Sequence, residues 1–295
     1  MENDLQLIPQ NDFGMILNRL DISKETKKDY LFRIKPFIAF IQSNGLKNDS
    51  FIDYKRHLQD RKDLSISSKN KYLTASRIVL SELSRTGKIP DITKGIKCFK
   101  QDKGHKKDGL NNAEIEKVTA YLNRLDSGLK AARLKAWFTL LALQGLRQIE
   151  IIRLDVTDID LKNGIAHVQG KGRDDKEIIF LNPSTVKAIG EYIKLSGVKS
   201  GALFYSLGNR KSERINSITI KRVFQDIFKV LEINKTVHGF RHYFITTLLN
   251  KMETRDVRKF SRHKNLEMLI VYDDEIDLRE KTEIVFNCFE SLKLA

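Results

Sequence analysis

One segment near the end of the chain, residues 237–272, carries four side chains that could act on a phosphate group: VHGFRHYFITTLLNKMETRDVRKFSRHKNLEMLIVY. His238 and Arg241 are three residues apart, which places them on one face of a helix. His263 follows, and Tyr272 comes nine residues after it. A straight helix of that length turns through roughly 900° and ends on the opposite side, so the chain must bend if His263 and Tyr272 serve one site. This set lacks a second cation and an acid, which the rest of the sequence must supply.

The composition favours a nucleic acid as the partner of the protein. The 295 residues carry a net charge of +15, and a field of that sign attracts polyanions. Hydrophobic residues make up 41% and charged residues 31%, as in a soluble globular chain with room for two domains. An anionic membrane surface is a weaker alternative, because no amphipathic anchor stands out. The longest apolar run, residues 136–143, is too short to cross a bilayer. Charge alone does not decide, since many soluble proteins are basic.

The cysteines and the N-terminus favour the cytoplasm. Cys98 and Cys288 stand far apart and form no metal or redox motif. The first ten residues, MENDLQLIPQ, have neither the basic nor the apolar region of a secretory signal. We therefore expect reduced cysteines in a reducing compartment.

Residues 1–90 predict a small bundle of four helices. Pro36 is expected to kink or divide the second of them. The outer face of the fourth helix carries three cations. The predicted helices lie near residues 10–20, from Ser23 to Asn44, from Asp49 or Ser50 onward, and from about residue 69, after the stretch SISS, to near Gly87.

Residues 91–109 lose this periodicity and are rich in lysine, which is typical of an interdomain linker. The chain is basic on both sides of it, so a DNA partner could be held by both domains, as in a clamp. A solvated linker without a DNA contact is the alternative. The candidate DNA-binding residues are Lys69, Lys71 and Arg77 on the fourth helix and Lys106 and Lys107 in the linker.

Residues 110–295 predict a second, mainly helical domain with a small antiparallel sheet, which makes the fold class mainly α (α+β). Gly145 marks a turn before a new helix that carries Arg147 and Glu150. Lys171 lies near the tip of a β-hairpin. The predicted helices span residues 111–125, 130–143, 184–196, 217–232, 239–251 and 254–262, and the predicted strands lie within 163–170 and 176–182.

Four short stretches, in their order and spacing, resemble the boxes of the tyrosine recombinases, the phage integrase family that includes the Xer-like enzymes. They are GLRQIEI, QGKG, HGFRH, and the histidine followed by a tyrosine nine residues later. The resemblance covers essentially the whole chain. It implies that residues 1–90 form a core-binding domain that clamps DNA, and that residues 110–295 form the catalytic domain.

The resemblance implies a site-specific recombinase that cuts and rejoins DNA through a 3′-phosphotyrosine intermediate. Tyr272 would be the nucleophile, helped by positive neighbours because free tyrosine has a pKa near 10. Lys171 would be the general acid for the leaving 5′-oxygen. His238 would accept a proton or contact the phosphate.

Charge stabilisation would come from the remaining residues. Arg147 and Arg241 would hold the non-bridging oxygens with planar, fixed-charge donors. His263 would donate a hydrogen bond to the phosphate, and Glu150 would orient an arginine. No metal or cofactor is expected, because arginine charge takes the place of a metal ion.

Several residues also have simpler interpretations. Arg147 could be a surface arginine at a helix end, and His242 is expected to pack. Tyr243 is a rival nucleophile, but it adjoins Arg241 instead of following a bend, so we expect it to pack as well. The order of the boxes, and no single residue, favours the recombinase.

Three other functions are weighed. A type IB topoisomerase would use the same chemistry as a monomer without site preference, and a non-catalytic DNA-binding protein would not need the full set of six catalytic positions. A metal-dependent nuclease could use Asp155, Asp158 and Asp160, but these lack the spacing of a calcium loop and are expected to cap and turn the chain.

The chain departs from the family pattern at Arg262, where a glycine usually precedes the histidine. This arginine could add a phosphate contact or alter how the His263 segment begins. The residues after Tyr272 are unusually acidic. An apolar stripe in residues 282–295 predicts a C-terminal helix, which in the family docks on a neighbouring protomer, with packing on its own domain as the alternative. By resemblance, a homo-tetramer would act on two DNA sites, in integration, excision, inversion or dimer resolution.

Overall fold

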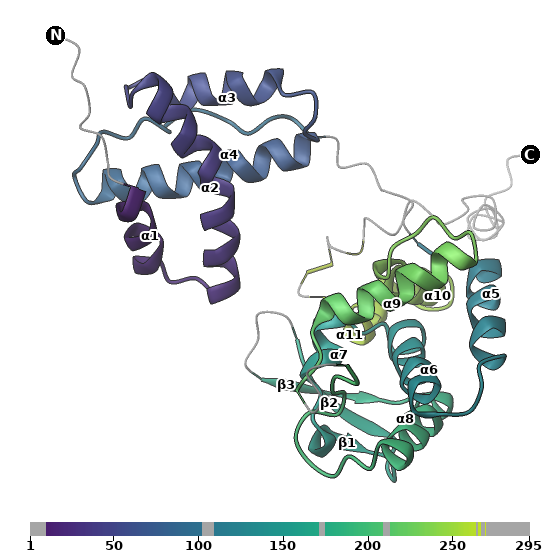
Figure 1. The fold of residues 1–295 in the computed structure, drawn as a ribbon. Helices are drawn as coiled ribbons and strands as arrows, with labels where there is room; N and C mark the ends of the chain where they lie inside the picture. Colours follow the sequence, from purple (N-terminus) through teal and green to yellow (C-terminus); the bar gives the residue numbers. More distant parts are fainter. Residues whose placement is uncertain are drawn as a thin grey trace, which may run out of the picture. The chain divides into compact units, whose positions relative to one another are not determined.

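The computed structural model describes residues 10–101, 109–170, 175–208, 213–263, 265–266 and 269, with side chains from Met15 onward. The chain divides into two compact units, Met1–Lys103 and Gly104–Ala295 (Figure 1). Both are mainly helical, and the second holds a small antiparallel sheet, so the predicted fold class is confirmed. In the described part of the chain, no helix is both long and apolar enough to span a membrane.

The first unit is a bundle whose helices bury their apolar faces against one another. Ser23 and Ser65 cap two helices, since each hydroxyl accepts a hydrogen bond from the backbone N–H three residues further on. Phe37 and Tyr54 are fully buried, with ring centroids 5.0 Å apart. Pro36 does not divide its helix. The helices are α1 (Gln10–Arg19), α2 (Lys24–Asn44), α3 (Ser50–Asp60) and α4 (Ile66–Arg85).

The chain beyond α4 packs back onto the bundle. Ile92 is buried in the same core, and Phe99 packs against it. The Asn70 side chain on α4 holds the backbone of Phe99 at both ends, donating to its carbonyl at 3.0 Å and accepting from its N–H at 2.8 Å. The part of the predicted linker 91–109 that is described in this unit therefore lies along the helices.

The second unit is organised around α6, whose residues from Ala136 to Ala142 are all buried. This helix packs against α8 and α10 and lies at the centre of the unit (Figure 1). Trp137 and Phe138 extend the core through edge-on contacts with Phe204 and Phe240. The helices are α5 (Asn112–Asn123), α6 (Leu129–Ala142), α7 (Gln148–Arg153), α8 (Pro183–Ser196), α9 (Ser217–Val230), α10 (His238–Leu249) and α11 (Thr254–Ser261).

A three-stranded antiparallel sheet in the order β1-β2-β3 lies at one side of this unit. The central strand β2 packs against α7. The predicted hairpin is β2 with β3, and His167 pairs with Ile178 at its middle. The short strand β1 adds to β2 and was not predicted. The strands are β1 (Ile159–Asp160), β2 (Ile165–Gln169) and β3 (Lys176–Phe180).

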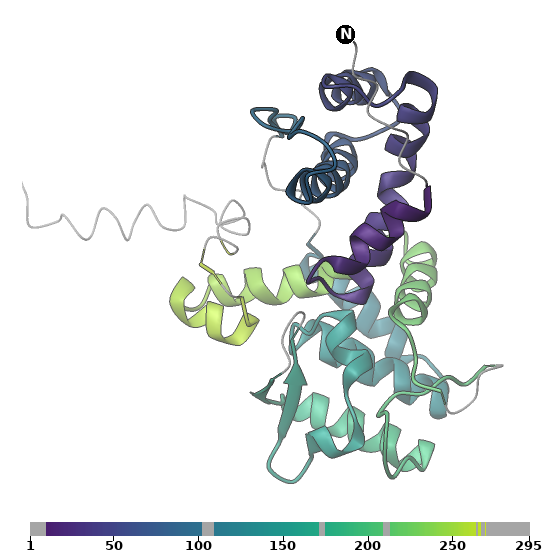
Figure 2. The ribbon, with the colours of Figure 1, turned by 90° about the vertical axis from the view of Figure 1, so that its left-hand side faces the viewer.

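Helices α10 and α11 pack against each other through a small cluster of their own, although Phe240 of α10 also belongs to the main core (the two yellow-green helices of Figure 2). Ile245 and Leu249 of α10 meet Val257 of α11 in a small buried cluster. This contact fixes the end of α11 relative to α10, and it therefore sets where residues 261–263 lie.

Candidate active site

Arg147 owes its position to a tight turn between α6 and α7. Gly145 has a φ of +58°, which a residue with a side chain rarely adopts. Leu146 is then fully buried, and Arg147 follows directly as the residue that precedes α7. Its side chain is 23% exposed, so this guanidinium lies at the edge of the interior with part of its surface open to solvent.

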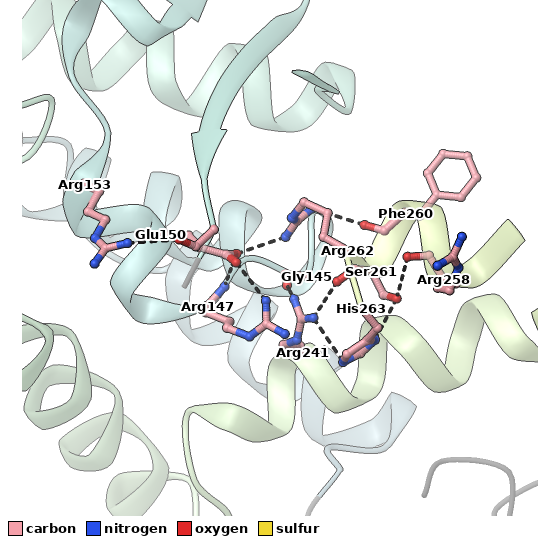
Figure 3. Close-up of polar contacts among 11 residues, drawn as sticks. Gly145, Arg147, Glu150, Arg153, Arg241, Arg258, Phe260, Ser261, Arg262 and His263 are labelled. Atoms are coloured by element: carbon pink, nitrogen blue, oxygen red, sulfur yellow. Dashed lines mark hydrogen bonds and ion pairs between the residues drawn. The ribbon is translucent and has the colours of Figure 1, made fainter. Parts of the chain in front are cut away.

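Glu150 is the central acceptor of the cluster (Figure 3). Its carboxylate is fully buried. Oε1 accepts from Arg147 Nη1 at 2.9 Å, and Oε2 accepts from the Arg147 backbone N–H at 2.8 Å and from Arg262 Nη2 at 3.0 Å. Burial raises the pKa of this carboxyl, but Arg262, Arg147 and Arg241 outweigh burial and bring the pKa below its ordinary value. Glu150 is therefore ionised at neutral pH.

Arg241 crosses from α10 to two other segments. Its side chain is almost fully buried. Nη1 donates to the carbonyl of Gly145 and Nη2 to that of Ser261, both at 2.5 Å. These two bonds join the α6–α7 turn to the end of α11, although the segments are far apart in the chain. Arg241 thus lies beside both Arg147 and His263.

His263 is held as a neutral ring. Its Nε2 lies 3.3 Å from Arg241 Nη2, and its Nδ1 lies 2.8 Å from Ser261 Oγ. A guanidinium has only donors, so Nε2 accepts and the ring proton belongs on Nδ1. Burial and the charges of Arg241, Arg147 and Arg262 lower the pKa of His263 to about 3. In this arrangement the histidine supports Arg241.

Arg262 ends α11 in a left-handed conformation, with φ 56° and ψ 40°. Its N–H bonds to the carbonyl of Lys259 and that of His263 to the carbonyl of Arg258, as in a Schellman motif. The position usually takes glycine, because a side chain there costs about 1–2 kcal/mol. Arg262 ends the helix directly before His263, and its side chain bonds to Glu150, whereas a phosphate contact of this arginine stays a prediction.

Four of the predicted site residues therefore come together from three separate segments: Arg147 and Glu150 from the turn and start of α7, Arg241 from α10, and His263 after α11 (Figure 3). His238 is exposed at the first position of α10. Lys171 and Tyr272, like Lys106, Lys107 and the apolar stripe of 282–295, lie outside the described residues.

The candidate DNA-binding residues on α4 differ in their surroundings. Lys71 is exposed. Lys69 donates to the carbonyl of Gln59 at 2.8 Å. Arg77 donates to the carbonyl of Ile96 at 2.5 Å, so its guanidinium fastens the segment after α4.

The three aspartates of the nuclease alternative each have a structural partner. Asp155 pairs with Arg214 and Asp158 with Lys176, both at 2.5 Å, and Asp160 accepts from Asn163. Among the described residues, no group of acidic, histidine or cysteine side chains could hold a metal ion. These aspartates cap and turn the chain.

The rival residues next to Arg241 pack as expected. His242 is buried, 3.3 Å from Thr246 Oγ1, and Tyr243 is half-buried against the main core.

No role in the site was predicted for three residues that hold its parts in place. Ser261 holds the ring of His263, and the Gly145 carbonyl holds Arg241. Arg153, one turn after Glu150, donates to the carbonyl of Gly170 at 3.0 Å and so anchors the end of β2 next to Lys171. The spacing of Arg153 on α7 was a possible signal, whereas nothing in the sequence pairs Ser261 with a ring nitrogen.

The arrangement suits the binding of one phosphodiester group. Two guanidinium groups and a histidine lie close together, and the buried carboxylate of Glu150 holds Arg147. Planar, preorganised donors stabilise negative charge that develops on a phosphate in the transition state.

Comparison with known proteins assigns the class: a sequence profile described as the phage integrase family matches residues 109–278. The chain belongs to this family, and the resemblance seen in its sequence is confirmed. The tyrosine recombinase XerC of Vibrio campbellii is 24% identical over 284 residues, covering 92% of this chain and 88% of that protein. A tyrosine recombinase of Synechocystis is 27% identical over 220 residues, covering 72% of this chain and 70% of that protein.

Solved structures share the fold. The XerH site-specific recombinase, bound to a palindromic difH substrate in a post-cleavage complex, matches with a TM-score of 0.73 at 19% identity, covering 96% of this chain and 86% of that one. A lambda integrase dimer bound to a COC′ core site matches with a TM-score of 0.67 at 16% identity, covering 89% and 75%.

Proposed function

We propose that this protein is a site-specific DNA recombinase that cuts and rejoins strands through a covalent bond to Tyr272. The observation that carries the proposal is the convergence of Arg147, Arg241 and His263 around a buried Glu150. Relatives and structural neighbours with this fold are recombinases and integrases, two of them bound to DNA. The charge of +15 fits the same partner.

The reaction is a transesterification in each direction. The Tyr272 oxygen attacks the phosphorus, its proton passes to a base such as His238, and the bond to the 5′-oxygen breaks. Lys171 gives a proton to that oxygen, which leaves as a hydroxyl. A 5′-hydroxyl from another strand then attacks the phosphotyrosine and gives its proton to Lys171, and the bond to Tyr272 breaks as its oxygen takes back the proton held by His238. The energy of the broken bond is kept in the phosphotyrosine, so rejoining needs no cofactor.

The two arginines contribute differently. Arg147 is partly exposed and can turn outward to the phosphate while Glu150 holds its backbone and one Nη. Arg241 is almost fully buried, and its two carbonyl bonds fix the plane of its guanidinium. Fixed donors cost no reorganisation when charge develops, and each is worth about 10²–10³ in rate in comparable sites.

The assembly follows from the family. We propose that residues 1–90 and 110–295 clamp one DNA site and that four protomers act on two sites, each passing its 282–295 helix to a neighbour. A DNA substrate implies action in the cytoplasm. The DNA sequence on which the protein acts would show whether its role is the integration or excision of a mobile element or the resolution of chromosome dimers.

A trapping experiment tests the chemistry. A pool of random-sequence duplexes, each nicked on one strand, is incubated with the protein in EDTA. Cleavage next to a nick releases a short fragment that diffuses away, so the covalent adduct accumulates and its DNA can be sequenced. Tyr272→Phe should abolish the adduct and keep DNA binding. Tyr243→Phe is the matched control and should leave the adduct unchanged.

Each alternative has its own outcome. An adduct that survives Tyr272→Phe overturns the choice of nucleophile. Cleavage that disappears in EDTA indicates a metal-dependent nuclease, and binding without any adduct indicates an architectural protein. Relaxation of supercoils without enriched sequences, and without exchange between two duplexes, indicates a topoisomerase.

A further inference from the structure

Arg262 combines a costly backbone with a buried charge. It is one of two residues other than glycine with positive φ among the described residues. Its side chain is 5% exposed, and burial lowers the pKa of its guanidinium against the opposing effect of Glu150. A strained, buried cation is kept only where the surrounding structure requires it.

The partner of Arg262 is the carboxylate that also holds Arg147. Arg262 Nη2 lies 3.0 Å from Glu150 Oε2, and Arg147 Nη1 lies 2.9 Å from Oε1. The two arginines and one glutamate carry a net charge of +1. Without Arg262 the pair Arg147–Glu150 would be neutral, and the carboxylate would oppose the negative charge of any phosphate that Arg147 binds.

Both terminal nitrogens of the Arg262 guanidinium bond to groups of the protein itself. Its Nη1 donates to the carbonyl of Phe260 at 3.1 Å and its Nη2 to Glu150. The ion pair also joins the end of α11 to α7, two segments separated by 112 positions in the chain. His263 follows directly, so the same contact sets the place of this histidine (Figure 3).

We propose that Arg262 is a positioning residue of the recombination site: its ion pair neutralises Glu150, so that Arg147 keeps its positive charge for the phosphate, and ties His263 to α7. This role rests on the proposed function. It concerns the step of bond cleavage, because the charge of Arg147 matters most when negative charge develops on the phosphate.

The test uses the full chain and the duplex recovered from the wild-type adduct, again nicked. Arg262→Gly removes the side chain and relieves the positive φ, so the variant is expected to fold. Arg262→Lys keeps the charge. Arg255→Ala, which removes an exposed arginine from the same helix, is the matched control. The rate constant of adduct formation at saturating DNA, the Kd for DNA and the thermal midpoint are measured for each.

Arg262→Gly should lower the rate constant by about tenfold or more while the Kd stays within about twofold, as for an interaction that matters in the transition state. Arg262→Lys should retain most of the rate, and Arg255→Ala all of it. Adding Glu150→Gln to Arg262→Gly restores the net charge to +1 and should raise the rate above that of Arg262→Gly alone. A merely structural defect would instead grow with the second substitution.

The outcomes that overturn the proposal are distinct from a failure of the proposed function. If the wild type forms no adduct with any duplex, the proposed function fails. If it does, and Arg262→Gly cleaves at the wild-type rate, the positioning role is wrong. Parallel losses of Kd and rate would make Arg262 a DNA contact instead, and a double variant slower than Arg262→Gly would exclude charge balance.

Discussion

Arg241 Nη2 and His263 Nε2 lie 3.3 Å apart, and the guanidinium donates to the ring. The acceptor nitrogen of His263 is therefore turned to Arg241, and the other nitrogen is turned to Ser261. To donate to a phosphate, as the sequence led us to expect, Nε2 must carry a proton. Either the ring becomes protonated, or its proton moves from Nδ1 to Nε2 and Ser261 Oγ donates to Nδ1. An arriving phosphate brings negative charge next to the ring, which raises the pKa of a histidine and favours the protonated ring.

The lowered pKa of His263 predicts an acid-sensitive fold. In the folded protein this pKa is about 3, against an ordinary value of 6.5, so the unfolded chain binds the proton first as the pH falls. The free energy of unfolding is therefore unaffected by this ring above about pH 6.5. Between that pH and about pH 3 it falls by up to about 1.4 kcal/mol per pH unit. Urea unfolding at a series of pH values measures this slope.

The control for this slope lies in the same unit. His263→Gln should be less stable at neutral pH, and its free energy of unfolding should fall less steeply on acidification. His167→Gln, on strand β2, should keep the wild-type slope. Equal slopes for the wild type and His263→Gln would show that the buried ring does not govern acid sensitivity.

Gly145 is predicted to be far more sensitive to substitution than another glycine of similar φ. A Cβ at Gly145 would run into the ring of Phe244, whereas a Cβ at Gly197 meets nothing within 4 Å. Their φ values are +58° and +66°, so both alanine variants have the same backbone cost of about 1–2 kcal/mol. Overpacking adds about 1–3 kcal/mol at Gly145 only.

Gly145→Ala should also lose cleavage, because the carbonyl of this residue receives Arg241. Urea unfolding and adduct formation are measured for both variants. Gly197→Ala should lose a little stability and no cleavage. If Gly145→Ala were as active and as stable as Gly197→Ala, the close approach of Phe244 to Gly145 would not constrain this turn.

Local patterns in the sequence predicted most of the elements. Apolar spacing located the helices of the first unit, and Ser23 marked the start of the second, because hydroxyl caps and helical periodicity act within a few residues. Gly145 correctly marked the break before Arg147, and the two predicted strands of the hairpin are β2 and β3. Residues 171 and 172 of the GKG turn lie outside the described residues. The short strand β1 carried too few residues for a period to be read.

Local patterns did not predict which residues from distant parts of the chain contact each other. That Arg241 would lie beside Arg147 followed from the resemblance and the shared chemistry, and not from spacing. The destination of Arg262 could not be predicted, because its partner Glu150 is 112 positions away and a phosphate would have suited the same charge. Arg77 was expected on an outer face, yet it holds the carbonyl of Ile96, since a helix face is exposed only until another segment covers it.

Two cations on α4 should respond differently to removal. Lys71 is exposed, so Lys71→Ala should weaken DNA binding uniformly across sequences and reduce the salt slope of log K by about 1. Arg77 holds Ile96 and lies 5.4 Å from the centroid of Phe51, so Arg77→Ala should cost about 1–2 kcal/mol of unfolding free energy. Binding titrations at several salt concentrations and thermal unfolding separate the two. The opposite pattern would exclude Lys71 as a DNA contact.

The general acid can be tested through the leaving group. Lys171→Ala should slow cleavage of an ordinary duplex by about 10²–10⁴, because the departing 5′-oxygen is then expelled without a proton. In a duplex with sulfur in place of that bridging oxygen, the 5′-sulfur leaves as a thiolate. Because a thiol has a pKa near 8.5, this leaving group needs no proton from an acid. Lys171→Ala should therefore cleave such a duplex at close to the wild-type rate. Arg147 is proposed to contact the non-bridging oxygens, so Arg147→Ala should cleave both duplexes slowly. If sulfur restored the rate of both variants, Lys171 would not be the general acid.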